Sequence, residues 1–535
     1  MMNLMCLDSR QHEGRTIHSL LDDVLRIHQK PEDIYEIAAI LESLGWNDDR
    51  VAKQFGVAGI FELAEILWEG CKTRIFVSRF AKTEAKPLWQ ITLTLVRQFL
   101  RGVIFAIPMA ISVFCMLTLK FSLWSFEHLS VELATSIAVG TILSFVTVGG
   151  FTQGIARRGF FYIIQGYYEM AKKITFRFIF FGFVVCALLC VLLFALNLII
   201  HMFTFHMLLI IIFYFFFLNS IWLSVTVMYI LRKELLFTGL IILGIFIVYV
   251  LFVLLNMNII FSQLIALAIV SAISMLFVMY LFKRAERKEE KGISPELPKM
   301  SVLMYSTMPY FVYGFLYFAF LFLDRMIAWT RNNDFMPYLI WFRGEYELGL
   351  DFSLLVLILP MGISEVILTK MMMDVETAQK GYWADETERM NQIYLRKYGR
   401  QMLQIFAVAF LCAYGLYWAL LQLGAHSQLF ASLHLFNSPV TKFVFIVSLI
   451  AYVFIAVALM NAVLLFSLSQ PGFVVRAIWI SILANLIVGF LLSRWIDYHY
   501  AVIGLLIGSG SFLVLTSRQV IRVLGNLDYY LYAAV

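Results

Sequence analysis

Twelve apolar stretches, each long enough to cross a bilayer as a helix, follow one another along this chain of 535 residues. A helix needs about twenty consecutive apolar residues to span the hydrocarbon core. From residue 97 onward such stretches recur with few charges inside them, centred near residues 109, 142, 188, 218, 245, 271, 315, 362, 412, 453, 483 and 511. The sequence therefore predicts an all-α polytopic membrane protein with twelve transmembrane helices.

The composition supports this prediction and excludes several classes of protein. Hydrophobic residues make up 61% of the chain and charged residues 14%, and the mean hydropathy is +0.84. A soluble domain has about a quarter of its residues charged. We therefore exclude a soluble enzyme, a disordered chain and a nucleic-acid-binding module. The net charge of +6 is explained by membrane topology rather than by nucleic-acid binding.

The amino-terminal segment differs from the rest, because residues 1–96 carry 11 Lys/Arg and 14 Asp/Glu, the density of a soluble domain. Four short helices are predicted in it. The second opens at Pro31 in its first turn, Asn47 caps the third, and Gly56 ends it. No basic recognition face is present. Residues 1–90 are predicted to form a helical cytoplasmic head with a protein-docking or regulatory role.

The positions of Lys and Arg predict the orientation in the membrane, since cytoplasmic loops are enriched in both. With the head in the cytoplasm, the inner segments hold 24 of these residues and the outer loops hold five. Both termini are therefore predicted to be cytoplasmic, and the protein is predicted to lie in the cell membrane. No cleavable signal peptide is expected, because the first thirty residues contain several acids and no long apolar core.

Six spans precede a charged segment and six follow it. We assign residues 91–283 to a first six-helix half, 284–300 to a cytoplasmic linker and 301–525 to a second six-helix half. Because six is an even number, the two halves have the same orientation, as in a parallel repeat about an axis along the membrane normal. Cytoplasmic stretches that mix aromatic and charged residues follow the second span of each half, at 157–173 and 374–400.

Charged residues inside the spans are the main candidates for a functional site, because they are costly in hydrocarbon and usually face an aqueous path. Asp324 and Arg325 end span 7 in FLFLDRMIAW, and Glu365 lies in span 8 within LPMGISEVILTK. The alternative is structural: a snorkelling pair at the outer interface for Asp324 and Arg325, and a partner such as Lys370 for Glu365. Pro360 and Gly362 would break span 8. Helix–helix hydrogen bonds are expected from three asparagines, Asn219, Asn461 and Asn485.

Motifs of covalent chemistry are absent from the sequence. It contains no GxxxxGK[ST], HExxH or GxSxG, and no CxxC pair. The six cysteines are scattered and four lie in apolar runs, where cysteine behaves as a small hydrophobic residue. We therefore predict a protein that is not an enzyme and that has neither a cofactor nor a metal site.

Twelve spans in a 6+6 parallel arrangement with a basic linker resemble the superfamily of multidrug, oligosaccharidyl-lipid and polysaccharide flippases. The end of span 7, FLFLDRMIAW, resembles the Asp-Arg/Lys-hydrophobic pattern of the polysaccharide members. The following EYELGLDFSLLVLILPMG, with its late proline, is similar to the membrane subunit of Pel-type exopolysaccharide exporters. The resemblance covers roughly residues 90–525 by topology but only about fifty residues by motif, and the head departs from the superfamily pattern.

The resemblance implies a V-shaped body whose central cavity opens alternately to each side and moves an amphiphilic saccharide cargo, a polysaccharide or a lipid-linked saccharide. Spans 1, 2, 7 and 8 line that cavity in the superfamily. In this chain those spans carry the four candidate site residues, Arg101, Asp324, Arg325 and Glu365. Membrane lipids and the cargo are the expected partners, with no nucleic acid.

Two other functions remain open from the sequence. A non-transporting scaffold or subunit of a polysaccharide synthase complex would have no aqueous cavity between the halves. An integral-membrane glycosyl- or acyltransferase would need a pair of aspartates at the membrane face. Asp374 and Asp385 are too far apart for that role and have no nucleotide-binding domain around them.

Overall fold

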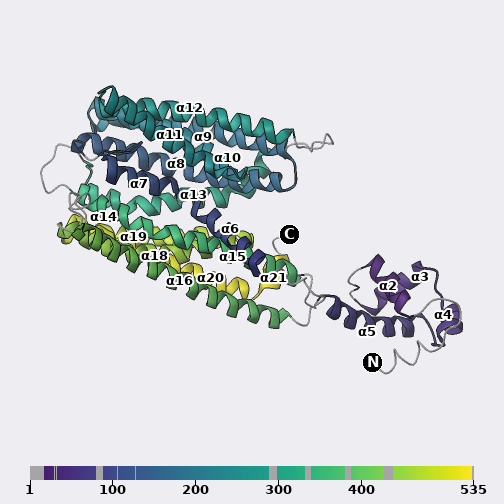
Figure 1. The fold of residues 1–535 in the computed structure, drawn as a ribbon. Helices are drawn as coiled ribbons and strands as arrows, with labels where there is room; N and C mark the ends of the chain where they lie inside the picture. Colours follow the sequence, from purple (N-terminus) through teal and green to yellow (C-terminus); the bar gives the residue numbers. More distant parts are fainter. Residues whose placement is uncertain are drawn as a thin grey trace. The chain divides into compact units, whose positions relative to one another are not determined.

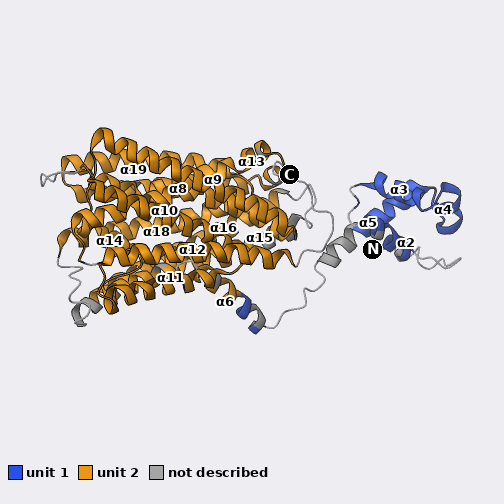
Figure 2. Ribbon diagram, turned by 90° about the horizontal axis from the view of Figure 1, so that it is seen from above, with its two compact units in different colours: residues 1–94 blue, residues 95–535 orange. Residues whose placement is uncertain are grey.

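A computed structural model describes residues 17–28, 31, 33–79, 88–104, 107–126, 128–287, 298–331, 339–379, 387–426 and 438–532. The chain divides into two compact units, residues 1–94 and 95–535, which are coloured separately in Figure 2. Most of the predicted linker, residues 288–297, lies outside the described residues. Each unit is described by itself.

The first unit contains a small four-helix core. Its helices are α2 (Ile17–Ile27), α3 (Ile34–Ser43), α4 (Asp48–Phe55) and α5 (Ile60–Arg79). Asn47 caps α4 by accepting a hydrogen bond from the Arg50 amide at 2.9 Å, and Gly56 ends it with a φ of 68°. The prediction for α3 was wrong by one turn: the cap is Asp33, whose side chain accepts from the Glu36 amide at 2.8 Å. Pro31 therefore lies before the helix. The Asp33 carboxylate satisfies a backbone amide at the start of α3 that has no partner within the helix.

The second unit is a bundle of long apolar helices, eleven of which in the described ranges are long and apolar enough to cross a membrane. Figure 1 shows two groups of helices with α13 between them. The first group contains α7 (Ile107–Leu119), α8 (Val131–Ile164), α9 (Tyr168–Ile200), α10 (Phe205–Ile230), α11 (Glu234–Tyr249) and α12 (Ile259–Glu286). The second follows α13 (Met300–Trp329) and contains α14 (Gly344–Leu354), α15 (Ile358–Gln379), α16 (Thr387–His426), α18 (Pro439–Ser467), α19 (Pro471–Trp495), α20 (Ala501–Leu524) and α21 (Leu527–Tyr532). Helix ends that the sequence places in the cytoplasm are called inner below, and the opposite ends outer.

Spans 1 and 8 of the twelve predicted spans are each described as two helices. Span 1 consists of α6 (Leu88–Ile104) and α7, and residues 105–106 between them lie outside the described set. Pro108 lies in the first turn of α7, where its missing N–H costs nothing. Span 8 consists of α14 and α15, joined by a 3₁₀ turn at Leu355–Leu357. Pro360 follows the 3₁₀ turn. It has no backbone N–H to donate to a carbonyl one helical turn earlier, which explains the predicted break.

The two halves are built to the same plan. Spans 2 and 4, 4 and 6, and 5 and 6 of the first half pack as α8 on α10, α10 on α12, and α11 on α12. Their counterparts in the second half pack as α14 on α18, α18 on α20, and α19 on α20. The main contact between the halves is made by α8 and α13. The membrane unit is therefore a parallel repeat of two six-span halves, as predicted.

Candidate functional site

Asp324 and Arg325 are buried inside the second half. They lie near the outer end of α13, about 36 Å along the helix from Met300 at about 1.5 Å per residue. The Asp324 side chain is fully buried and Arg325 is 7% exposed. A snorkelling pair would keep its charged ends in interfacial water. The burial therefore excludes the snorkelling interpretation.

The two residues bind neighbours on α14. The Tyr346 hydroxyl donates to Asp324 Oδ2 at 2.7 Å. Arg325 donates through Nη1 to Glu347 Oε2, and through Nη2 to Asp351 Oδ1 at 2.9 Å. The charge cluster, as we call Asp324, Arg325, Glu347 and Asp351, thus joins spans 7 and 8 of the same half. Among the described residues, the hydrogen bonds and ion pairs of the cluster lie within the second half.

Charge in this cluster is unbalanced, because three carboxylates face one guanidinium. Glu347 is almost fully buried, and the Trp329 indole donates to its Oε1 at 2.9 Å. Asp324 Oδ1 is buried and has no hydrogen-bond donor among the described residues. The Asp351 side chain is 56% exposed. A charge exposed within an apolar span normally faces water rather than hydrocarbon, so Asp351 marks the polar edge of the cluster.

Glu347 and Asp351 were missed by the sequence interpretation, although a signal for them exists. They lie four residues apart in EYELGLD, at the start of an apolar span. Residues at i and i+4 share one face of a helix. One face of α14 therefore presents both carboxylates to the same guanidinium. The surplus of acid next to Asp324-Arg325 could have been read from this spacing.

Aromatic rings connect the charge cluster to the first half. The Arg325 guanidinium lies 5.4 Å from the centre of the Phe322 ring. Phe145 of α8 stacks against Phe318 and Phe322 of α13, with ring centroids 5.4 and 5.6 Å apart. Trp222 of α10 packs on Phe145 at 4.7 Å. These half-buried rings at the border between the halves can present flat apolar faces to a ligand.

Two glycine pairs bring the backbones of the halves into contact. A Cβ on either Gly149 or Gly314 would overlap the carbonyl oxygen of the other, so the backbones of α8 and α13 are in contact at this point. A Cβ on Gly102 of α6 would lie 2.7 Å from the Cα of Gly362 in α15. Spans 2 and 7 thus form one crossing, and spans 1 and 8 form the other.

Glu365 lies at the second crossing. A Cβ on Gly102 would lie 3.2 Å from Glu365 Cβ, so Glu365 is beside the residue that follows Arg101. The side chain of Arg101 lies outside the described residues. Glu365 is about 21 Å further along span 8 than Asp351 at about 1.5 Å per residue. The structure therefore brings Asp324 and Arg325 together and places Glu365 in a separate, inner location.

The predicted helix–helix role of the asparagines is confirmed for two of them. Asn461 of α18 accepts from the Tyr398 hydroxyl at 2.9 Å and donates to Ser517 at 3.0 Å, which links α16, α18 and α20. Asn485 of α19 donates to the Phe320 carbonyl of α13 at 3.4 Å. Asn219 is fully buried in α10. Asn461 and Asn485 are thus explained by packing.

Comparison with known proteins identifies the fold. No protein-family model matches the sequence, and no curated protein matches it significantly. The Vibrio cholerae MATE transporter VcmN, solved as a point mutant, matches with a TM-score of 0.52 and 14% identity over 81% of this chain and 98% of that chain. The bent form of VcmN matches with a TM-score of 0.50 and 15% identity, over 82% of this chain and 99% of that chain. A MATE transporter in a straight conformation matches with a TM-score of 0.53 and 12% identity, over 80% of this chain and 96% of that chain.

These identities show the fold alone. They confirm the fold that the resemblance to the flippase superfamily implied, and the narrower resemblance to Pel-type exporters stays a prediction. The membrane unit of this protein has the fold of the MATE transporters.

Proposed function

We propose that this protein is a membrane transporter that moves a polysaccharide or a lipid-linked saccharide across the cell membrane by alternating access. The two halves would rock against each other and expose the site between them to one side at a time. The transport involves no covalent step. The head would hold synthase subunits at the inner face, so that new polymer reaches the transporter directly.

One observation carries this proposal: the charge cluster reaches the border between the halves with an ionisable edge. Asp351 is exposed within an apolar span, and Arg325, which binds it, also packs on Phe322. Phe322 in turn stacks on Phe145 of the other half. A saccharide presents hydroxyls to charged groups and an apolar face to rings. Carboxylates beside aromatic faces offer both kinds of contact.

The two glycine crossings support the alternating-access part of the proposal. At both crossings, Gly149–Gly314 and Gly102–Gly362, glycine backbone of one half touches glycine backbone of the other with no Cβ between them. A small change of crossing angle there displaces few side chains, whereas interlocked large side chains resist such a change. The crossings are therefore suitable pivots for one half against the other.

A reconstitution assay tests the proposal. The purified full chain is placed in liposomes with a fluorescent lipid-linked oligosaccharide, and the fraction of label accessible to an added quencher is followed over time. We expect movement with wild type and strong loss with Asp324→Asn, which keeps shape but removes charge. Asp497→Asn is the matched control, since Asp497 is an outer, half-exposed carboxylate 3.8 Å from Arg331.

Two outcomes would contradict the proposal. No movement with wild type, together with co-purification of synthase subunits, would favour a scaffold. Equal movement with Asp324→Asn and wild type would remove the charge cluster from the transport path. The orientation is tested separately by reporter fusions at residues 10, 290 and 530, which are expected to be cytoplasmic, and at 340, which is expected to be external.

A further inference from the structure

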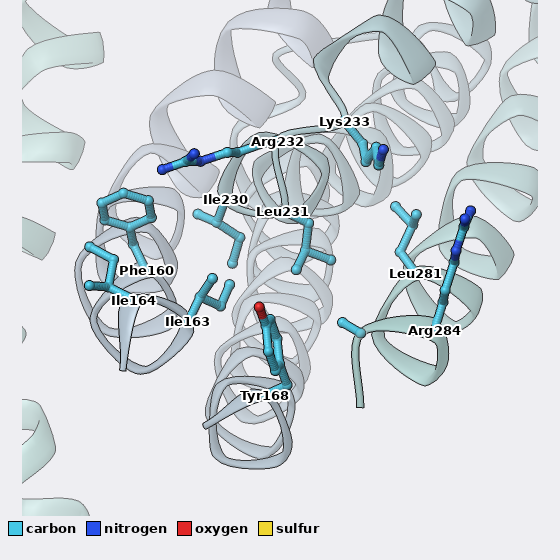
Figure 3. Close-up of a pocket in the computed structure, with 11 residues that line it drawn as sticks. Phe160, Ile163, Ile164, Tyr168, Ile230, Leu231, Arg232, Lys233, Leu281 and Arg284 are labelled. Carbon is cyan, nitrogen blue, oxygen red and sulfur yellow. The ribbon is translucent and has the colours of Figure 1, made fainter. Parts of the chain in front are cut away.

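A pocket of about 340 Å³ lies at the inner end of the first half, where α8, α10 and α12 end and α9 begins. Figure 3 shows its lining from four helices. The end of α8 contributes Phe160, Ile163 and Ile164, and α9 begins there with Tyr168. The turn between α10 and α11 contributes Ile230, Leu231, Arg232 and Lys233, and the end of α12 contributes Leu281, Arg284 and Ala285.

The pocket combines a cationic rim with an apolar floor. Arg232, Lys233 and Arg284 are its charged lining residues, and no carboxylate lines it. Within the described part of the chain, none of the three is recorded in an ion pair. Neighbouring lysines are neutralised instead: Lys172 pairs with Glu286 at 2.9 Å and Lys173 with Glu169 at 2.6 Å. Among the described residues, the rim thus carries three cations that form no ion pair.

The backbone turn that carries two of these cations does not require them. Arg232 has a φ of 57°, a left-handed conformation that glycine adopts more readily. The Arg232 amide donates to the Tyr229 carbonyl at 3.0 Å, and the Lys233 amide donates to the Met228 carbonyl at 2.8 Å. These two bonds close the end of α10 as a helix C-cap.

The second half makes the same turn with neutral residues. Between α18 and α19, Ser469 has a φ of 58° and its amide donates to the Phe466 carbonyl at 3.0 Å. The Gln470 amide donates to the Leu465 carbonyl at 2.8 Å. Ser-Gln therefore satisfies the geometry that Arg-Lys satisfies in the first half. The two cations serve something other than the turn.

We propose that this pocket binds the phosphate of an anionic phospholipid headgroup, with the acyl chain lying on the apolar floor. Basic pockets between helices at the cytoplasmic face bind such headgroups. Arginine and lysine donate to phosphate oxygens, and the hydroxyl of Tyr168 is directed into the pocket (Figure 3). The inference does not depend on the proposed cargo.

The surroundings of the floor favour a lipid over free phosphate. Ile164, a lining residue, is 67% exposed, and Phe160 beside it is also exposed. Leu235, two residues beyond Lys233, is 66% exposed. In a membrane protein such side chains contact acyl chains, so the pocket opens onto the lipid-facing surface. Free phosphate would use the cations and leave the floor unused.

Native mass spectrometry of the full-length protein in neutral detergent tests the proposal, with phosphatidylglycerol, phosphatidylcholine and inorganic phosphate as probes. We expect one phosphatidylglycerol to bind in preference to phosphatidylcholine. Arg232→Ser/Lys233→Gln copies the turn of the second half and should therefore fold normally. The triple variant, which adds Arg284→Gln, should bind phosphatidylglycerol about a hundredfold more weakly than wild type. Each of the three cations near an anionic headgroup contributes about a fivefold effect.

Arg476→Gln/Arg518→Gln is the matched control, because it removes two exposed arginines from the second half. It should bind phosphatidylglycerol as wild type does. Equal weakening by the control and by Arg232→Ser/Lys233→Gln would overturn the site and indicate general attraction to basic ends. Wild-type binding by the triple variant would also overturn it. Inorganic phosphate is not expected to displace phosphatidylglycerol at equal concentration. If it does so, and if the displacement depends on the same three cations, the pocket is a site for free phosphate and the lipid proposal is overturned.

Discussion

The two halves of the membrane unit share their backbone plan but not their polar chemistry. Gly102 and Gly314 both lie fourteen residues beyond the first residue of their helices, Leu88 and Met300. Gly149 and Gly362 both lie eighteen residues beyond Val131 and Gly344, where spans 2 and 8 begin. Small residues that set the approach of helices are thus placed at equivalent depths in the two halves.

The polar interiors differ. In the first half Tyr214 donates to Gln263 at 2.8 Å, and Gln263 donates to the carbonyls of Ser122 and Ser125 at 3.1 and 3.0 Å. This network is neutral and its groups are paired. The second half instead buries Asp324, Arg325 and Glu347. Burying ions costs more than a neutral network of the same size. The difference indicates that the repeat sets the packing, whereas the fully or almost fully buried charges among the described residues lie in the second half.

The largest expected effect comes from removing the single cation of the charge cluster. Arg325→Gln leaves Asp324 and Glu347 buried without a counter-charge and should lower the free energy of unfolding by about 3–5 kcal/mol. Thermal unfolding in detergent measures this loss. Arg325→Gln/Glu347→Gln should recover much of the stability while transport stays low.

Arg494→Gln is the control for that substitution, because Arg494 is partly exposed near the outer end of α19 and donates to Thr330 at 2.7 Å. It should change stability by less than about 1 kcal/mol. If Arg325→Gln unfolds at the wild-type temperature, the charge cluster is not a buried network and the contrast between the halves fails.

The next effect separates the two glycine crossings. A Cβ at Gly314 meets a backbone carbonyl, which cannot move without shifting α8, whereas a Cβ at Gly362 meets side-chain atoms of Phe99 and Val103 at 2.8 Å. Gly314→Ala should therefore cost about 2–3 kcal/mol and Gly362→Ala less. Unfolding temperatures of the two variants provide the measurement. A larger loss for Gly362→Ala than for Gly314→Ala would show that the backbone contact at Gly314 is not the tighter of the two crossings.

A smaller effect is expected in the neutral network of the first half. Gln263→Leu keeps the volume but leaves the Tyr214 hydroxyl and two carbonyls without that partner. The cost should be about 1–2 kcal/mol. Transport per folded molecule should stay at the wild-type level, because no charge is involved. Loss of transport in a stable Gln263→Leu protein would show that both halves carry the polar function.

The sequence predicted the spans and the repeat, and it selected Asp324-Arg325 as a candidate site, because hydropathy and costly charges are local properties of the chain. It did not predict the partners, since Glu347 and Asp351 become neighbours of Arg325 only when spans 7 and 8 pack. The glycine crossings were invisible for the same reason: Gly149 and Gly314 are unremarkable in sequence until α8 meets α13.

The smallest effect on stability is expected where the effect on function is large. Asp351 is 56% exposed, and an exposed ion pair contributes about 0–1 kcal/mol. Asp351→Asn should therefore unfold within a few degrees of wild type, since Arg325 keeps its bond to Glu347. Transport should nevertheless fall sharply in the liposome assay, because Asn cannot provide the charge at the exposed edge of the cluster. Asp351→Glu, which keeps the charge on a longer arm, should retain more transport than Asp351→Asn. If both variants transport as wild type does, the surplus carboxylate only tunes the environment of Arg325, and the asymmetry between the halves is a matter of stability rather than transport.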